Sequence, residues 1–179
     1  SIPFKYEDGP IKTEAQYPGI KEEGDQYWQT HYSEGVYVGY RWYDSKDVPV
    51  QWPFGHGLSY TTFEYSNAKA SKPVMKKGGT IKVSVDVTNT GDVDGAEIVQ
   101  LYIADPQASI DRPAKELKGF EKVYLKAGQT AQVTFEIAED ALSWFDAEKH
   151  AWVAEPGEFQ ALFAASSKDV KAMASFELK

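Results

Sequence analysis

The sequence contains no cysteine. That absence excludes disulfide bonds, thiol catalysis and cysteine-ligated metal, and it is compatible with either the cytoplasm or the periplasm. Long hydrophobic runs are missing too, since no apolar stretch approaches the roughly 20 residues that a helix needs to span a bilayer. We therefore expect neither a membrane-spanning segment nor a membrane partner.

An excess of basic residues is also absent. The chain has 19 lysines and arginines against 27 aspartates and glutamates, a net charge of −8, and its basic residues are scattered. Binding to nucleic acid needs clustered positive charge to neutralise phosphates, so this class of partner is excluded. The three histidines, His31, His56 and His150, are far apart and lack HExxH-like spacing, so we predict no metal and no cofactor.

The chain opens on Ser1 and not on methionine. We expect a mature or trimmed product, so the lack of a signal peptide does not argue against export. A periplasmic or secreted location is the expectation, and the cytoplasm stays open.

What is present falls into two parts that meet near residue 62. Residues 1–61 show no sustained hydrophobic period and combine prolines and glycines with many aromatic rings between Tyr27 and Tyr60. Such a segment cannot bury itself alone, so we expect it to wrap over a surface that lies mostly outside this chain. A short helix is predicted over Glu34–Tyr40 or Tyr32–Arg41.

From Thr62 onward apolar and polar residues alternate, as in half-buried strands. The predicted strands centre on Ile81–Val87, Val99–Ile103, Leu117–Leu125, Val133–Ile137, Ala151–Val153, Phe159–Phe163 and Met173–Leu178. A single helical turn is expected at Glu139–Leu142. Seven or eight strands separated by turn residues predict a mainly β fold, an immunoglobulin-like β-sandwich, over residues 62–179.

Two segments carry a family resemblance. Residues 32–44 read YSEGVYVGYRWYD and residues 53–61 read PFGHGLSYT. Both resemble motifs of glycoside hydrolase family 3, and they occur in the family's order and spacing. The resemblance implies that residues 1–61 are the C-terminal tail of an α/β sandwich catalytic domain with its linker, and that residues 62–179 are a fibronectin type III-like domain.

The same resemblance implies a function. Family members are retaining exo-acting glycosidases, and a β-glucosidase is the first expectation, followed by a β-xylosidase. The family's nucleophile and acid/base carboxylates lie on motifs that this sequence does not contain, so the isolated chain is expected to be inactive. Its partners would be the remaining catalytic domains, in the same or a cleaved chain, and through them an oligosaccharide; a homodimer is left open. A carbohydrate-binding β-sandwich module is the alternative.

Four residues of the first motif, Glu34, Arg41, Trp42 and Asp44, are candidates for the border of an active site. A structural role is the favoured interpretation, in which Glu34 and Asp44 accept backbone N–H groups or pair with Arg41. Arg41 would then lock the loop in a buried ion pair.

Other tempting residues carry weaker signals. The acidic group Glu22–Asp25 is interpreted as a solvated loop, because such loops are commoner than carboxyls with a raised pKa. Ser59 lacks the GxSxG context of a nucleophile. The aromatic residues Trp144, Phe145 and Trp152 are expected to pack the sandwich or its contact with missing domains, in preference to forming a carbohydrate platform.

Overall fold

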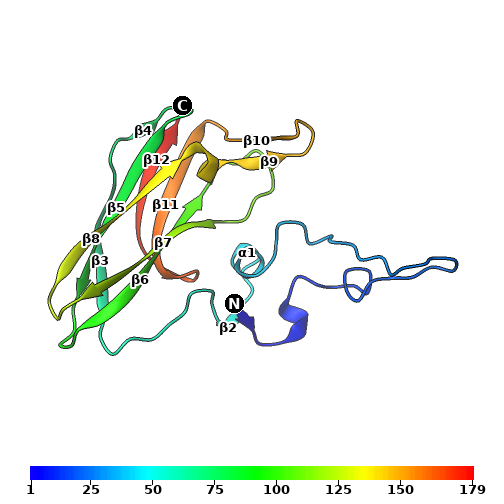
Figure 1. Ribbon diagram of the computed structural model, residues 1–179, viewed down its shortest axis with the longest axis horizontal. Helices are drawn as coiled ribbons and strands as arrows, with labels where there is room; N and C mark the ends of the chain where they lie inside the picture. Colours follow the sequence, from blue (N-terminus) through cyan, green and yellow to red (C-terminus); the bar gives the residue numbers. More distant parts are fainter.

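A computed structural model describes all residues, 1–179, and shows a β-sandwich with an N-terminal extension that projects from one side of it (Figure 1). One sheet has the order β4 (Val74–Met75), β12 (Asp169–Leu178), β11 (Gly157–Ser166), β6 (Gly95–Ala104), β7 (Glu116–Leu125). The other has the order β3 (Phe63–Ala70), β5 (Thr80–Asn89), β8 (Thr130–Ala138). The mainly β sandwich predicted from the alternating residues is thereby confirmed.

The central strand β5 shows why the sandwich forms. Its alternate residues Ile81, Val83, Val85 and Val87 are at most 1% exposed. They face the core because successive side chains of a strand point to opposite faces. The antiparallel partner β8 continues this apolar face, with Val133 directly opposite Val85.

The second sheet closes the core through pairs that are distant in sequence. Strand β6 pairs antiparallel with β7 and with β11, and β11 in turn forms a hairpin with β12. The core-facing residues Leu101 of β6 and Phe163 of β11 lie opposite each other. The loop between β6 and β7, residues 105–115, reaches toward the extension (Figure 1).

A short hairpin stands outside both sheets. It consists of β9 (Trp144–Asp146) and β10 (Ala151–Val153), and the 3-10 turn η2 (Glu139–Leu142) precedes it. The helical turn at Glu139–Leu142 matches the prediction. The strand expected over Ala151–Val153 exists, but it pairs only with β9 and so does not belong to the sandwich sheets.

The extension has little regular structure. Strand β1 (Ile2–Pro3) pairs with β2 (Val50–Trp52), η1 covers Tyr6–Asp8, and α1 covers Tyr40–Ser45. The helix predicted over Glu34–Tyr40 or Tyr32–Arg41 is wrong, because Gly35 (φ +57°) and Gly39 (φ +55°) adopt left-handed conformations that interrupt a right-handed helix. No helix of the structure has the length and apolar character needed to cross a membrane.

Candidate functional site

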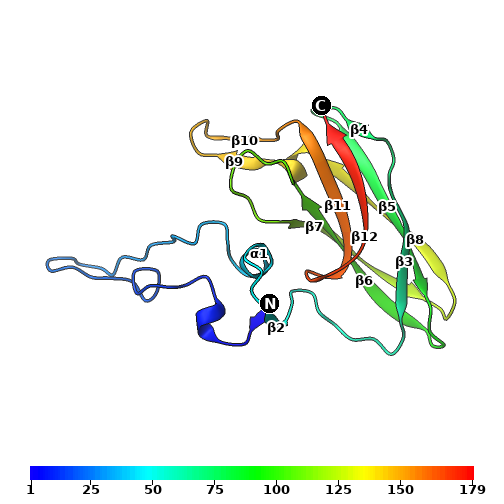
Figure 2. The same ribbon diagram turned by 180° about the vertical axis from the view of Figure 1, so that it is seen from behind.

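The second half of the extension rests on the sandwich. Residues 37–56 contact the outer face of the five-stranded sheet and the β6–β7 loop, and we call this set of contacts the docking seam. Figure 2 shows α1 at this position, beside the start of β7 and the end of β11. The chemistry of the seam follows from three groups of residues.

An aromatic cluster forms the first group. Tyr102 lies between two core residues of β6 and therefore points to the opposite, outer face, yet it is 0% exposed. Tyr40 of α1 meets it edge-on with ring centroids 5.7 Å apart, and Phe54 of the second motif lies 5.3 Å from Tyr40. The hydroxyl of Tyr40 also accepts the backbone N–H of Leu117 at 2.8 Å. The two motifs thus meet on one patch of the sheet.

Gln100 of β6 binds the second motif. Its amide nitrogen donates to the carbonyl oxygens of Ala165 at 2.9 Å and Gly55 at 3.3 Å, while its amide oxygen accepts the Tyr102 hydroxyl at 2.6 Å. Gly55 has φ +78°, and a Cβ there would overlap the Gln100 amide. Glycine at this position therefore serves both backbone conformation and close approach.

Ion pairs on Asp44 form the second group. The Asp44 side chain is 4% exposed and pairs with Lys115 of the β6–β7 loop at 2.8 Å and with Lys168 at 3.6 Å. Lys168 follows β11, so the carboxylate joins α1 to two separate loops of the sandwich. A carboxylate paired with two ammonium groups from different loops fixes the position of α1 on the sandwich.

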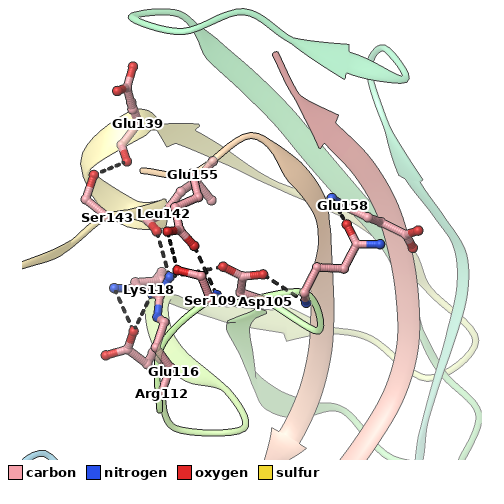
Figure 3. A network of polar contacts seen from close by, with 11 residues as sticks. Asp105, Ser109, Arg112, Glu116, Lys118, Glu139, Leu142, Ser143, Glu155 and Glu158 are labelled. Atoms are coloured by element: carbon pink, nitrogen blue, oxygen red, sulfur yellow. Dashed lines mark hydrogen bonds and ion pairs between the residues drawn. The ribbon is translucent and has the colours of Figure 1, made fainter. Parts of the chain in front are cut away.

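Arg41 belongs to a third group centred on Glu116, the first residue of β7. Glu116 pairs with Arg41 at 3.3 Å and with Arg112 at 3.1 Å. Arg112 also contacts Asp105 at 3.3 Å and donates to the carbonyl oxygen of Leu142 at 3.1 Å (Figure 3). Burial raises the pKa of Asp105, and the nearby Glu155 carboxylate adds to that rise. The backbone N–H of Gln107 and the charge and hydrogen bond of Arg112 oppose it.

The remaining two candidates, Glu34 and Trp42, bind residues of the first half of the extension. Glu34 accepts a hydrogen bond from the Gln16 amide at 3.0 Å, and the Trp42 indole donates to the carbonyl oxygen of Asp8 at 2.8 Å. The four candidates therefore do not converge on one point. The expected pairing of Arg41 with Glu34 or Asp44 is wrong: its partner is Glu116, and its side chain is 35% exposed, so the pair is only half-buried.

Sequence reasoning missed Tyr37 and its partners. The Tyr37 hydroxyl donates to Asp111 at 2.5 Å and lies 3.1 Å from the Arg112 carbonyl oxygen, and burial together with the Asp111 carboxylate raises the pKa of Tyr37 to about 12. Tyr37 lies inside the first motif, and this position could have marked it as a candidate contact residue. Nothing in the sequence marked Asp111 or Arg112, because they follow no period.

The first half of the extension has different surroundings. No hydrogen bond or ion pair joins residues 1–36 to residues 62–179. Tyr27, Trp28 and Tyr32 are 72%, 63% and 80% exposed. Within the acidic group, Asp25 accepts the backbone N–H of Glu22 at 3.1 Å, as in an ordinary turn.

Comparison with known proteins gives a consistent result. Residues 97–167 match the fibronectin type III-like domain family. The chain is 49% identical to a β-glucosidase of Bacteroides ovatus over 99% of its length, and 42% identical to an exo-α-(1→6)-L-arabinopyranosidase of Bifidobacterium breve over 95%. A solved family 3 β-glucosidase of Bifidobacterium adolescentis superposes with a TM-score of 0.88 at 40% identity over 99% of the chain.

The chain spans about a quarter of the length of these relatives: 23% of the first, 21% of the second and 25% of the third. The resemblance drawn from the two motifs is confirmed. What the chain resembles is the part of family 3 glycoside hydrolases that carries the fibronectin type III-like domain.

Proposed function

Starting from this similarity to family 3 glycoside hydrolases, we propose that the chain is the C-terminal portion of a retaining, exo-acting β-glycosidase. The enzyme would release terminal β-D-glucosyl residues from oligosaccharides in the periplasm or outside the cell. Within it, residues 1–61 would complete an α/β sandwich catalytic domain, and the sandwich of residues 62–179 would support that domain structurally.

The observation that carries this proposal is the contrast within the extension. Residues 37–56 are fixed to the sandwich by the docking seam, whereas residues 1–36 expose large rings such as Trp28, 63% exposed. Burying each such side chain stabilises a protein by about 1.5–3 kcal/mol. A neighbouring domain would supply that burial, and the seam would hold the segment in position for it.

The contacts of Glu34 and Asp44, the two acidic candidates of the first motif, support a structural role over a role in glycoside hydrolysis. Retaining glycosidases use two carboxyl groups about 5–5.5 Å apart as nucleophile and acid/base. Glu34 accepts a hydrogen bond from the Gln16 amide, and Asp44 forms an ion pair with Lys115 of the β6–β7 loop. The proposed catalytic carboxylates therefore belong to the rest of the enzyme.

The relatives also support placing substrate choice outside this chain. Similar sequences occur in β-glucosidases and in an arabinopyranosidase, so one kind of C-terminal part accompanies different sugars. We take a β-glucoside as the first substrate and a β-xyloside as the second.

A direct test compares the full-length enzyme with residues 1–179 alone. The full-length enzyme should hydrolyse an aryl β-glucoside, and the isolated chain should not. Hydrogen exchange at residues 1–36 should be fast in the isolated chain and slow in the full-length enzyme. Hydrolysis by the isolated chain that disappears in Glu34→Gln would overturn the proposal, as would equally fast exchange in both proteins.

A further inference from the structure

The hairpin β9–β10 presents an aromatic pair to solvent. Trp152 lies directly opposite Phe145 in the antiparallel register, with ring centroids 5.7 Å apart and an interplanar angle of 69°. Trp152 is 70% exposed and Phe145 is 49% exposed. These two residues do not pack within the sandwich, because the hairpin projects beyond both sheets (Figure 1), so a contact with missing domains is the part of the expectation that stays a prediction.

The tip of the hairpin is held in one conformation. Asp146 accepts the backbone N–H groups of Glu148 and Lys149, each at 3.0 Å, and pairs with the Lys149 ammonium at 2.7 Å. The hydrogen bond from the Lys149 side chain and those of the turn hold the pKa of Asp146 below its usual value. An aromatic pair on a fixed turn loses little conformational entropy when it binds a partner.

Both ends of the hairpin are tied to the β6–β7 loop (Figure 3). On the β9 side, Arg112 donates to the carbonyl oxygen of Leu142 at 3.1 Å. On the β10 side, Glu155 accepts the Ser109 hydroxyl at 2.5 Å and its backbone N–H at 3.1 Å. The same loop binds Tyr37, so it is a common base for the hairpin and for the extension.

The hairpin β9–β10 and the N-terminal extension project from the same side of the sandwich (Figures 1 and 2). We propose that the hairpin is a docking site for the α/β domain that residues 1–36 complete, with Trp152 as its anchor. This inference rests on the proposed function.

Size favours this partner. A domain of about 200 residues is about 40 Å across. The three-residue strands of the hairpin extend only about 10 Å. A domain built around residues 1–36 would occupy the space into which the hairpin projects. Tryptophan is one of the three residue types, with tyrosine and arginine, that are enriched among the residues that dominate binding energy at interfaces.

The ring geometry argues against a sugar as the occupant. A carbohydrate platform presents ring faces side by side so that pyranose rings can lie flat on them. Here the edge of one ring meets the face of the other, at 69°. An edge-to-face pair suits insertion between side chains of another protein surface.

The test uses the full-length enzyme with one engineered cysteine at a time. Trp152→Cys probes the hairpin, and Tyr124→Cys is the matched control, since Trp152 and Tyr124 are 70% and 73% exposed in this chain. Trp28→Cys probes the extension. Maleimide labelling is followed by mass spectrometry in native buffer and in urea, with the parent enzyme as background. We expect labelling at position 152 to be slower than at position 124 by about tenfold or more.

The outcomes separate this inference from the proposed function. If position 28 is protected while position 152 reacts as fast as position 124, the hairpin does not dock and the proposed function stands. If positions 28 and 152 both react fast, both proposals fail. If position 152 becomes protected only when an oligosaccharide is added, the occupant is a sugar and the inference is overturned.

A second measurement avoids substitution. Hydroxyl-radical footprinting of the unmodified full-length enzyme reports side-chain accessibility at Trp152 and Tyr124 directly. Low oxidation of Trp152 beside high oxidation of Tyr124 is expected, although tryptophan is the more reactive residue. Strong oxidation of Trp152 would overturn the inference even if the cysteine variants failed to fold.

Discussion

Replacing Arg112 with methionine should destabilise the 179-residue chain by about 3–5 kcal/mol, because it leaves buried carboxylates without their cation. The Arg112 side chain is 10% exposed and pairs with Asp105, 8% exposed, and Glu116, 17% exposed. Methionine has a similar length and fills much of the same space, so the loss is electrostatic and not a cavity effect.

The two carboxylates should not contribute equally to the loss. Glu116 keeps Arg41 at 3.3 Å and Lys118 at 3.7 Å, whereas Asp105 keeps only the backbone N–H of Gln107 at 3.2 Å. Adding Asp105→Asn to Arg112→Met removes the orphaned charge and should therefore recover most of the lost stability.

The deficit should also depend on pH. Burial already raises the pKa of Asp105, and removing Arg112 takes away a charge that opposes the rise. A carboxyl whose folded pKa lies above its unfolded value adds stability that is present below the unfolded pKa, about 3.9, and is lost as pH rises through the folded pKa. The gap between Arg112→Met and the parent should therefore be largest at neutral pH and should narrow on acidification.

Urea unfolding followed by circular dichroism at about pH 7 and about pH 4.5 measures both effects. Lys118→Met is the control, because Lys118 lies 3.7 Å from Glu116 and is 22% exposed, so its loss should cost below about 1 kcal/mol. A cost for Arg112→Met as small as that of the control, or one that is equal at both pH values, would refute the reasoning.

Three further predictions concern single side chains. Gly55→Ala should lower the free energy of unfolding by about 1–3 kcal/mol, because Gly55 has a left-handed backbone and a Cβ there would overlap Gln100. Thermal melting checks this, with Gly57→Ala as the control, since a Cβ at Gly57 would meet nothing within 4 Å. Burial raises the pKa of Glu97, so the stability that the Glu97 carboxyl contributes is present at low pH and is lost as pH rises through the folded pKa. Glu97→Gln should therefore raise the melting temperature at about pH 7 and leave it unchanged at about pH 4. Tyr40→Phe removes the acceptor of a half-buried backbone N–H and should cost about 1–3 kcal/mol in urea unfolding.

Strand positions followed from the sequence wherever one face of a strand is buried without interruption. Strand β5 is of this kind, since alternation of Ile81 to Val87 reflects one continuous core face. Strand β3 was not singled out, and its register explains why. The register of its pairing with β5 shifts between Ser66 and Lys69, where Asn67 has φ +53°. This bulge interrupts the alternation of apolar and polar residues from which strands are predicted.

The seam was only partly predictable, because an ion pair requires knowledge of which distant segments meet. A structural role was predicted for Arg41 and Asp44, and the structure places both in ion pairs, although not with each other. Their partners, Glu116 and Lys115, follow them by more than 70 positions and carry no local pattern that links them to the motif. Pairing of β6 with β7 brings these residues to α1, and that pairing is a property of the whole sandwich.

The ion pairs around Arg112 and Glu116 contribute more to the orientation of neighbouring segments than to stability. Buried ion pairs contribute little net stability compared with apolar packing, because both charges must be desolvated. They are, however, directional: Arg112 reaches the hairpin through Leu142 and the start of β7 through Glu116, and its own carbonyl oxygen binds Tyr37. A purely apolar contact could slide by one residue and remain buried, whereas this set of contacts is satisfied in one register. The β6–β7 loop therefore holds the hairpin β9–β10 and residues 37–56 in one relative orientation, and that orientation is a property of this chain.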